Sequence, residues 1–151
     1  MILTLVTLPA VEPVSLEEAK SHLRVDGDDE EDLISASLTA ARELCELEAR
    51  RAFITQTWEL ALERWPKDDQ IVLPRPPLQS VSSIKYLDWQ GVESTIDSND
   101  YLVDTASKPG RVLLDYGKCW PSATLRPGPA IRVRYVAGFG DSAEDVPQRY
   151  R

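Results

Sequence analysis

The sequence predicts an α+β fold: an N-terminal helical hairpin, then an antiparallel β-sheet or small sandwich insert, then the start of a C-terminal helix. Two observations lead to this class. Apolar residues recur at helical spacing over residues 15–51, and short alternating stretches recur between turn signals over residues 53–138. Helices followed by a run of strands are typical of α+β proteins.

The length and charge of the chain limit the classes of function. Its 151 residues correspond to about one domain, long enough to bury a core without disulfides or metal. Twenty-five acidic and seventeen basic residues give a net charge of −8, which disfavours general binding to nucleic-acid phosphates. The sequence has no secretory signal and no run of about 20 apolar residues, so we expect a soluble cytoplasmic protein.

Residues 1–25 predict an extended arm followed by a short helix. Pro9 and Pro13 punctuate the apolar arm, residues 1–14, and disfavour helix there. Ser15 is followed three residues later by Glu18, which is the pattern of a capping box. The short helix is therefore expected to begin after Ser15 and to end near Val25.

A longer helix is expected over residues 28–51. Acidic residues crowd its first turn and Arg50 and Arg51 its last, so both ends complement the helix dipole. Its expected apolar stripe comprises Leu33, Ile34, Leu38, Ala41, Leu44 and Cys45. Cys45 and Cys119 belong to no CxxC pair, and we expect two buried or half-buried thiols.

Seven strands are expected between residue 54 and Gly138. They fall within residues 54–65, 71–73, 81–89, 93–96, 101–103, 111–115 and 130–138. After them, Ser142, Asp145 and Pro147 form a helix-start pattern close to the last residue, as expected of a truncated helix or of a tail that orders on a partner. We therefore divide the chain into an arm (1–14), a helical hairpin (15–52), a β-rich insert (53–138) and a turn with the start of a C-terminal helix (139–151).

The acidic stretch VDGDDEED, residues 25–32, is the first candidate site. Read as an EF-hand loop from Asp26, it places Glu31 where glycine is needed and Ser37 where the closing glutamate is needed. A helix N-terminus explains the acids without a metal. The sequence therefore predicts no metal, cofactor or catalytic residue here, and a weak divalent-cation site is the alternative.

Other candidates also have simple structural interpretations. His22 is the only histidine and lies near a helix end, which disfavours a metal site or a Ser–His–Asp triad. The PxxP of residues 73–80 is expected to connect strands, with an SH3-type ligand as the alternative. GFG, residues 138–140, lacks the rest of a phosphate-binding loop. Trp120, in the loop 118–129, is the aromatic residue that we expect to contact a partner.

These features favour a protein that functions by contacting other proteins and not by catalysis. The alternatives from other classes are a small metal-dependent or hydrolytic enzyme that uses residues 26–32, and a peptide-binding module that uses a sheet edge. Cation titration would distinguish the first, because a real site raises thermal stability by ligand linkage.

Several segments resemble the head–tail connector (adaptor) family of tailed bacteriophages and prophages. They are EPVSLEEAKSHLRVDGDDEEDLI, AFITQTWEL, LPRPPLQSVSSIKYLD, DYLVD with PGRV, and VRYVAGFGDSAEDVP, in the family's order. The resemblance covers nearly the whole chain. Family members usually continue into one or two further helices after the VP at residues 146–147, where this sequence ends four residues later.

The resemblance implies a non-enzymatic structural protein of the virion neck, assembled in the cytoplasm of a bacterial host. It implies a ring, usually of twelve copies, that contacts the portal protein and a tail-side stopper or tail-terminator protein. DNA would pass nearby without specific binding, and no membrane is involved. The arm, the helical hairpin and the loop 118–129 are the candidate contact regions.

Overall fold

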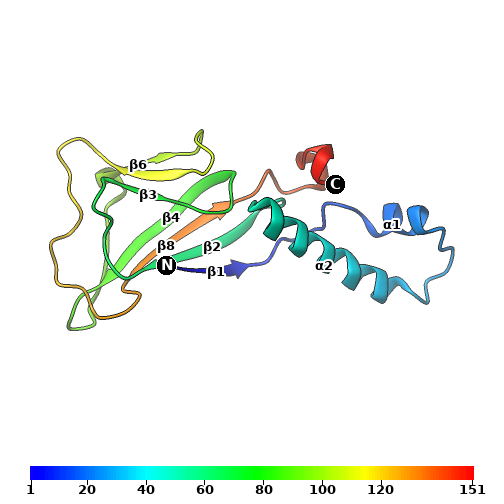
Figure 1. Ribbon diagram of the computed structural model, residues 1–151, viewed down its shortest axis with the longest axis horizontal. Coiled ribbons are helices and arrows are strands. Elements are labelled where there is room, and N and C mark those ends of the chain that lie inside the picture. The colour runs from blue at the N-terminus through cyan, green and yellow to red at the C-terminus, as the bar shows by residue number, and fades with distance from the viewer.

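The computed structural model describes residues 1–151 and shows an elongated molecule with its β-sheets at one end and its helices at the other (Figure 1). The α+β class predicted from the sequence is confirmed. The helices are α1 (Leu16–Leu23) and α2 (Glu31–Ala49). The strands are β1 (Ile2–Thr7), β2 (Gln56–Leu62), β3 (Gln70–Val72), β4 (Leu78–Leu87), β5 (Glu93–Thr95), β6 (Tyr101–Asp104), β7 (Arg111–Leu114) and β8 (Ile131–Ala137). Neither helix has the length and apolar composition needed to cross a membrane.

Two antiparallel sheets form a small sandwich. The larger sheet has the order β1-β2-β8-β4-β5, and the smaller one has the order β3-β7-β6. Inward residues of both sheets form one core, because alternate residues of each strand point to the same face. The core residues are Ala52, Trp58, Leu60, Ile71, Leu73, Leu78, Ile84, Ile96, Tyr101, Val112, Ile131, Val133, Tyr135 and Ala137.

β1 is a strand that the sequence analysis did not assign. Residues 2–7 are extended, as expected, and they pair with β2 as the edge of the larger sheet. Leu3 and Leu5 pack against the core, whereas Ile2 and Thr4 are exposed. The pairing is irregular between Leu5 and Thr7, and the chain then leaves the sheet toward the helices.

The two helices are consecutive and contact each other. The capping box predicted at α1 is present: Ser15 Oγ accepts from Glu18 N at 3.1 Å, and Glu18 Oε2 accepts from Ser15 N at 2.9 Å. Arg24 and Arg50 end α1 and α2 in the left-handed conformation. Because α2 ends at Ala49, Arg50 is its cap and its last turn holds no basic residue, contrary to the dipole pattern expected from the sequence.

A joint connects the helices to the sandwich. Three segments, residues 52–55, 76–77 and 138–140, exchange backbone hydrogen bonds there. Ala52 N donates to Pro76 O at 3.1 Å, Gly138 N to Pro77 O at 3.0 Å, and Thr55 N to Gly140 O at 2.9 Å. Beside them Phe53, Ile54 and Val146 form a second, small apolar cluster.

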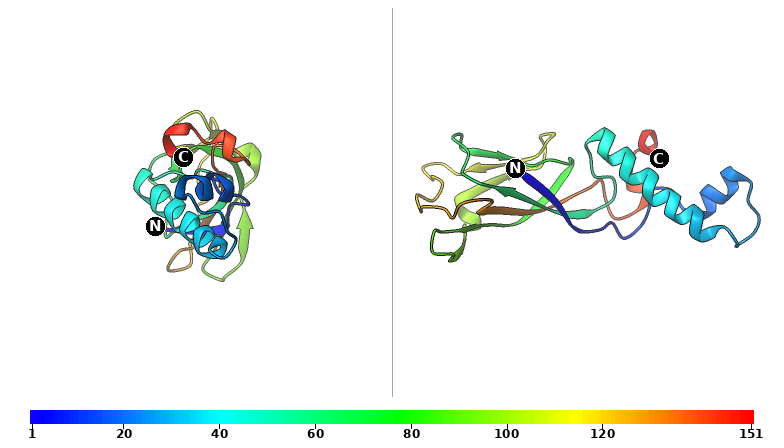
Figure 2. Two further views of the ribbon diagram at one scale, coloured as in Figure 1. Left: turned by 90° about the vertical axis from the view of Figure 1, so that its right-hand side faces the viewer. Right: turned by 60° about the horizontal axis from the view of Figure 1, so that its bottom comes forward.

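The C-terminal residues form short 3₁₀ helices at Ala143–Asp145 and Gln148–Tyr150, where the sequence pattern predicted the start of a helix. Ser142 and Asp145 form the expected capping arrangement, with Ser142 Oγ donating to Asp145 Oδ2 at 2.9 Å. The Tyr150 ring stacks on Phe53, with 5.2 Å between ring centroids. These contacts hold the C-terminal segment beside α2, at the end where the helices meet the sheets (Figure 2).

Candidate interaction surfaces

The acidic stretch lies at the junction of α1 and α2, as predicted from the sequence. Lys20 Nζ lies 3.0 Å from Asp28 Oδ1 and 2.6 Å from Glu31 Oε1, so one lysine of α1 holds the start of α2. The hydrogen bonds to Glu31 and Asp28 raise the pKa of Lys20, and the bond from Lys20 lowers the pKa of Asp28. No group of three or more His, Cys, Asp or Glu side chains is arranged to hold a metal ion.

A buried polar network fixes α2 to the arm and to the joint. Arg42 donates to Glu12 Oε2 from Nε at 2.8 Å and to Glu46 Oε2 from Nη1 at 2.9 Å. The other oxygen of Glu46 accepts from Phe53 N and from Gln56 Nε2, both at 2.7 Å. Burying charged groups is tolerated only when they are paired in this way. The network therefore sets which face of α2 points inward.

The apolar stripe predicted on α2 is only partly buried, which corrects the sequence analysis. Ile34 is buried and Leu38 is half-buried, whereas Leu33, Ala41, Leu44 and Cys45 are exposed. The inward face of α2 is the one that carries Arg42 and Glu46. The reason is that the helices extend beyond the sheets, so few elements of this chain are available to cover α2 (Figure 1).

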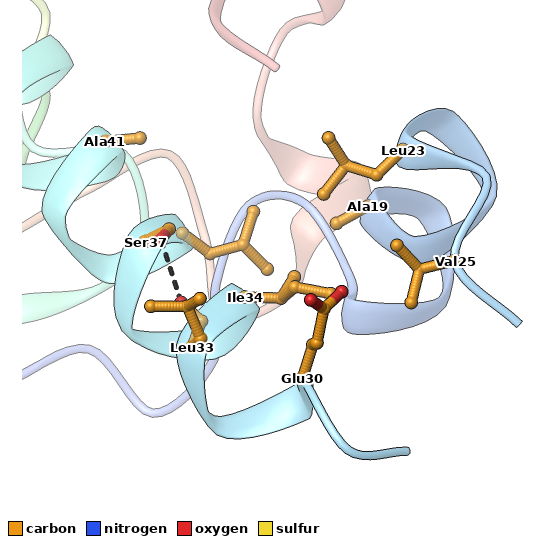
Figure 3. A pocket seen from close by; sticks show the side chains of 9 residues that line it. Ala19, Leu23, Val25, Glu30, Leu33, Ile34, Ser37 and Ala41 are labelled. Atoms are coloured by element: carbon orange, nitrogen blue, oxygen red, sulfur yellow. Dashed lines mark hydrogen bonds between the residues drawn. The ribbon is translucent and has the colours of Figure 1, made fainter. Parts of the chain in front are cut away.

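An apolar groove runs between α1 and α2. Its volume is about 490 Å³, and Leu23 and Val25 face Ile34 and Leu33 across it (Figure 3). Leu23 is 57% exposed and Leu33 is 68% exposed. Ser37 Oγ turns back to Leu33 O at 2.8 Å, so this hydroxyl is satisfied within the helix. The groove is therefore mainly an apolar surface and offers little directed polar chemistry.

A second pocket lies between the C-terminal half of α2 and strands β1 and β2. It has a volume of about 230 Å³, and Leu5, Leu47, Gln56, Trp58 and Arg75 are among the residues that line it. Gln56 Oε1 and Trp58 Nε1 are buried and have no hydrogen-bond partner within the chain. Because buried polar groups are nearly always paired, these two unpaired atoms are exceptions within the fold. Sequence reasoning missed them, since only the fold shows which partners are absent.

Trp120 contacts its own chain, although the sequence analysis selected it as a partner contact. Its ring stacks on Trp65 at 5.0 Å between centroids, and its Nε1 donates to Asp68 O at 3.1 Å. The exposed tryptophan at this end is Trp89, which is 66% exposed in the β4–β5 turn. Asp88 Oδ1 accepts from Gln90 N and Val92 N, and so holds that turn in place.

The other candidates lie apart from one another. His22 is exposed in the last turn of α1. Both cysteines are free and exposed, so the expected burial of Cys45 and Cys119 is wrong. The PxxP segment connects β3 and β4, as predicted, and Pro74 O accepts from Tyr135 Oη at 2.8 Å. Residues 138–140 belong to the joint.

The sequence and the fold are similar to those of known connector and neck proteins. The model of the family described as "Phage gp6-like head-tail connector protein" matches residues 13–108, more than half of the chain. Among solved structures, a chain of the virion of a native gene transfer agent (GTA) particle is 25% identical with a TM-score of 0.78. The match covers 97% of this chain and 76% of that chain.

Two further matches come from GTA necks. A chain from the neck of an empty GTA particle, computed with C6 symmetry, is 27% identical with a TM-score of 0.77, and the match covers 97% of this chain and 76% of that one. A chain from the neck of a native GTA particle, computed with C12 symmetry, is 27% identical with a TM-score of 0.72, covering 97% and 75%. No curated protein matches the chain.

Proposed function

Because the chain belongs to the phage gp6-like head–tail connector family, we propose that it occupies a ring at the neck of a tailed phage or phage-like particle and joins the portal to a tail-side protein. It is a structural head–tail connector subunit. One observation supports the ring and its position above all others: 97% of the chain is matched by a chain from a GTA neck computed with C12 symmetry.

We propose that the subunit works by contact and without catalysis. In the acidic stretch, which the enzyme alternative would use, Asp28 and Glu31 are paired with Lys20 and hold the start of α2. The exposed apolar groove of α1 and α2 suits protein–protein contact. A net charge of −8 also suits a ring through which DNA passes without being held by its phosphates.

A tagged copy expressed in cells that assemble the parent particles tests this function. The product is purified through the tag, imaged by negative-stain electron microscopy, and analysed by mass spectrometry. Portal protein and neck-shaped particles should co-purify with the tag. An equally tagged cytoplasmic protein is the control. Recovery of the chain alone, while untagged necks assemble normally, would contradict the proposal.

A further inference from the structure

We propose that the groove between α1 and α2 is the docking site for a basic amphipathic helix of a different protein. Because it names the chemistry of one partner of the neck subunit, this inference rests on the proposed function. The groove has a volume of about 490 Å³, and seven of the nine residues that line it are apolar. Two of them, Leu23 and Leu33, are 57% and 68% exposed, so the groove is open to solvent.

The chain itself leaves the groove uncovered. All of the lining residues belong to the segment 19–41, in α1, α2 and their connection. The C-terminal residues are held elsewhere, since Tyr150 stacks on Phe53 and Arg151 Nε donates to Pro13 O at 3.0 Å. An uncovered apolar groove marks an interaction site, and the space between two helices accepts a third by interdigitation of side chains. The shape therefore suits a helix with apolar residues along one side.

Charge selects a basic occupant, because all of the excess negative charge lies at the helical end. Residues 8–51 and 139–151, which form this end, hold fifteen acidic and seven basic side chains. Residues 1–7 and 52–138, which contain the strands, hold ten of each. The net charge of −8 is therefore confined to the helices and the segments beside them. A basic partner is attracted to this end, whereas DNA or a second copy of this chain is repelled.

The acids closest to the groove are free to meet such a partner. Glu30 lines the groove, and Asp29 and Asp32 flank it in the sequence; all three are exposed and form no salt bridge within the chain (Figure 3). Lys20 is already paired with two other acids of the stretch, and Arg24 is the only other base between residues 16 and 41. Lysine or arginine on the polar side of an incoming helix can therefore pair with these carboxylates while its apolar side enters the groove.

Two designed peptides test the docking site on the purified chain. Both are fluorescent, about 15 residues long and carry leucine at helical spacing on one side. The other side is lysine in one peptide and glutamate in the other. We expect fluorescence anisotropy to show the lysine peptide binding about tenfold more tightly or better, with an affinity that falls as salt is added. Equal binding of the two peptides would overturn the inference.

Matched variants locate the bound peptide. Leu33→Ser removes an apolar side chain from the groove, and Leu102→Ser, on β6 and 56% exposed, is its control. Glu30→Lys reverses a charge at the groove, and Glu63→Lys reverses that of an exposed glutamate after β2. Each groove variant should bind the lysine peptide about five- to tenfold more weakly, and each control within about twofold of wild type. Circular dichroism verifies that all four fold, and wild-type affinity in either groove variant contradicts docking in the groove.

A photo-crosslinking residue at position 33 tests the site in assembled necks. Mass spectrometry of necks purified from particle-producing cells maps the cross-linked segment. A cross-link to a segment of a different protein with an excess of lysine and arginine supports the inference, and a cross-link to any other segment, or none, overturns it. Absence of the tagged wild type from necks would contradict the proposed function instead, because peptide binding to the purified chain does not depend on assembly.

Discussion

Arg42 and Glu46 form an ion pair in which both side chains are buried. Arg42 Nη1 lies 2.9 Å from Glu46 Oε2, and the side chains are only 3% and 7% exposed. The pair spans one turn of α2, and through Glu46 it reaches the backbone of Phe53 just before β2. It therefore links the helices to the sandwich, and its removal should affect the whole fold.

Arg42→Met should lower the free energy of unfolding by about 3–5 kcal/mol, because it leaves the carboxylates of Glu12 and Glu46 without their cation. Urea denaturation at pH 7 measures this difference. Lys85→Met is the matched control, since the Lys85–Glu93 pair is 41% and 43% exposed. The control should lose less than about 1 kcal/mol. Equal losses in the two variants would show that the buried pair has no special role.

Asp104 should make stability depend on pH in acid. Hydrogen bonds from the side chain and backbone of Ser107, and then from Arg111, lower the pKa of Asp104 from 3.8 to about 2. Because the folded pKa is the lower one, the stabilisation is present above pH 3.8 and is lost as the pH falls toward 2.

Asp104→Asn should therefore melt below wild type at pH 7, and the two melting temperatures should converge as the pH approaches about 2. A series of thermal melts between these pH values measures the difference. A difference that stays constant over the series would show that the Asp104 carboxylate does not contribute through its pKa.

Gly138→Ala should be strongly destabilising, because Gly138 has a φ of +138° and an added Cβ would lie 2.6 Å from the backbone of Ile54 and Thr55. Strained backbone and overpacking together should cost about 2–5 kcal/mol. Gly128→Ala is the control, with a φ of +93° and no atom within 4 Å of the added Cβ. Its cost should not exceed about 2 kcal/mol. If both variants unfold at the same urea concentration, close packing at the joint is not the cause.

Two serine-to-alanine substitutions should differ in their effect on stability, and only the first should destabilise the fold. Ser15→Ala removes the N-cap of α1 and should cost about 1 kcal/mol. Ser37→Ala removes a hydroxyl that bonds back to Leu33 O within α2, and it should be neutral or stabilise the fold by a few tenths of a kcal/mol. Chemical denaturation of the two variants beside wild type tests both signs. A stabilising Ser15→Ala would show that the capping box does not hold α1.

The elements with strong local signals were predictable from the sequence. Ser15 and Glu18 mark the start of α1, and the alternation of Trp58, Leu60 and Leu62 marks β2, because both patterns depend on nearby residues alone. β1 was missed because the prolines after it suggested an unpaired arm. Only its pairing with β2 makes it a strand.

The interaction surfaces were less predictable, because exposure depends on which elements a chain has available to cover a helix. Periodicity identified Leu33, Leu44 and Ile34 equally as apolar, and only Ile34 is buried in this subunit. Trp120 was selected because it lies in a proline-rich loop, but its stacking partner Trp65 is 55 residues away in the sequence. Contacts between residues so distant leave no local pattern.

The joint determines how the subunit responds to mechanical load. Backbone hydrogen bonds connect residues 52–55, 76–77 and 138–140, and the buried Arg42–Glu46 pair supports them from the helical side. A single flexible linker would let the two ends swing independently. Here residues 52–55 and 138–140, which pass between the two ends, are bonded to each other and to residues 76–77, so we expect the helices and the sandwich to move as one body. A push or twist applied to the helices should therefore be passed to the sandwich through the joint.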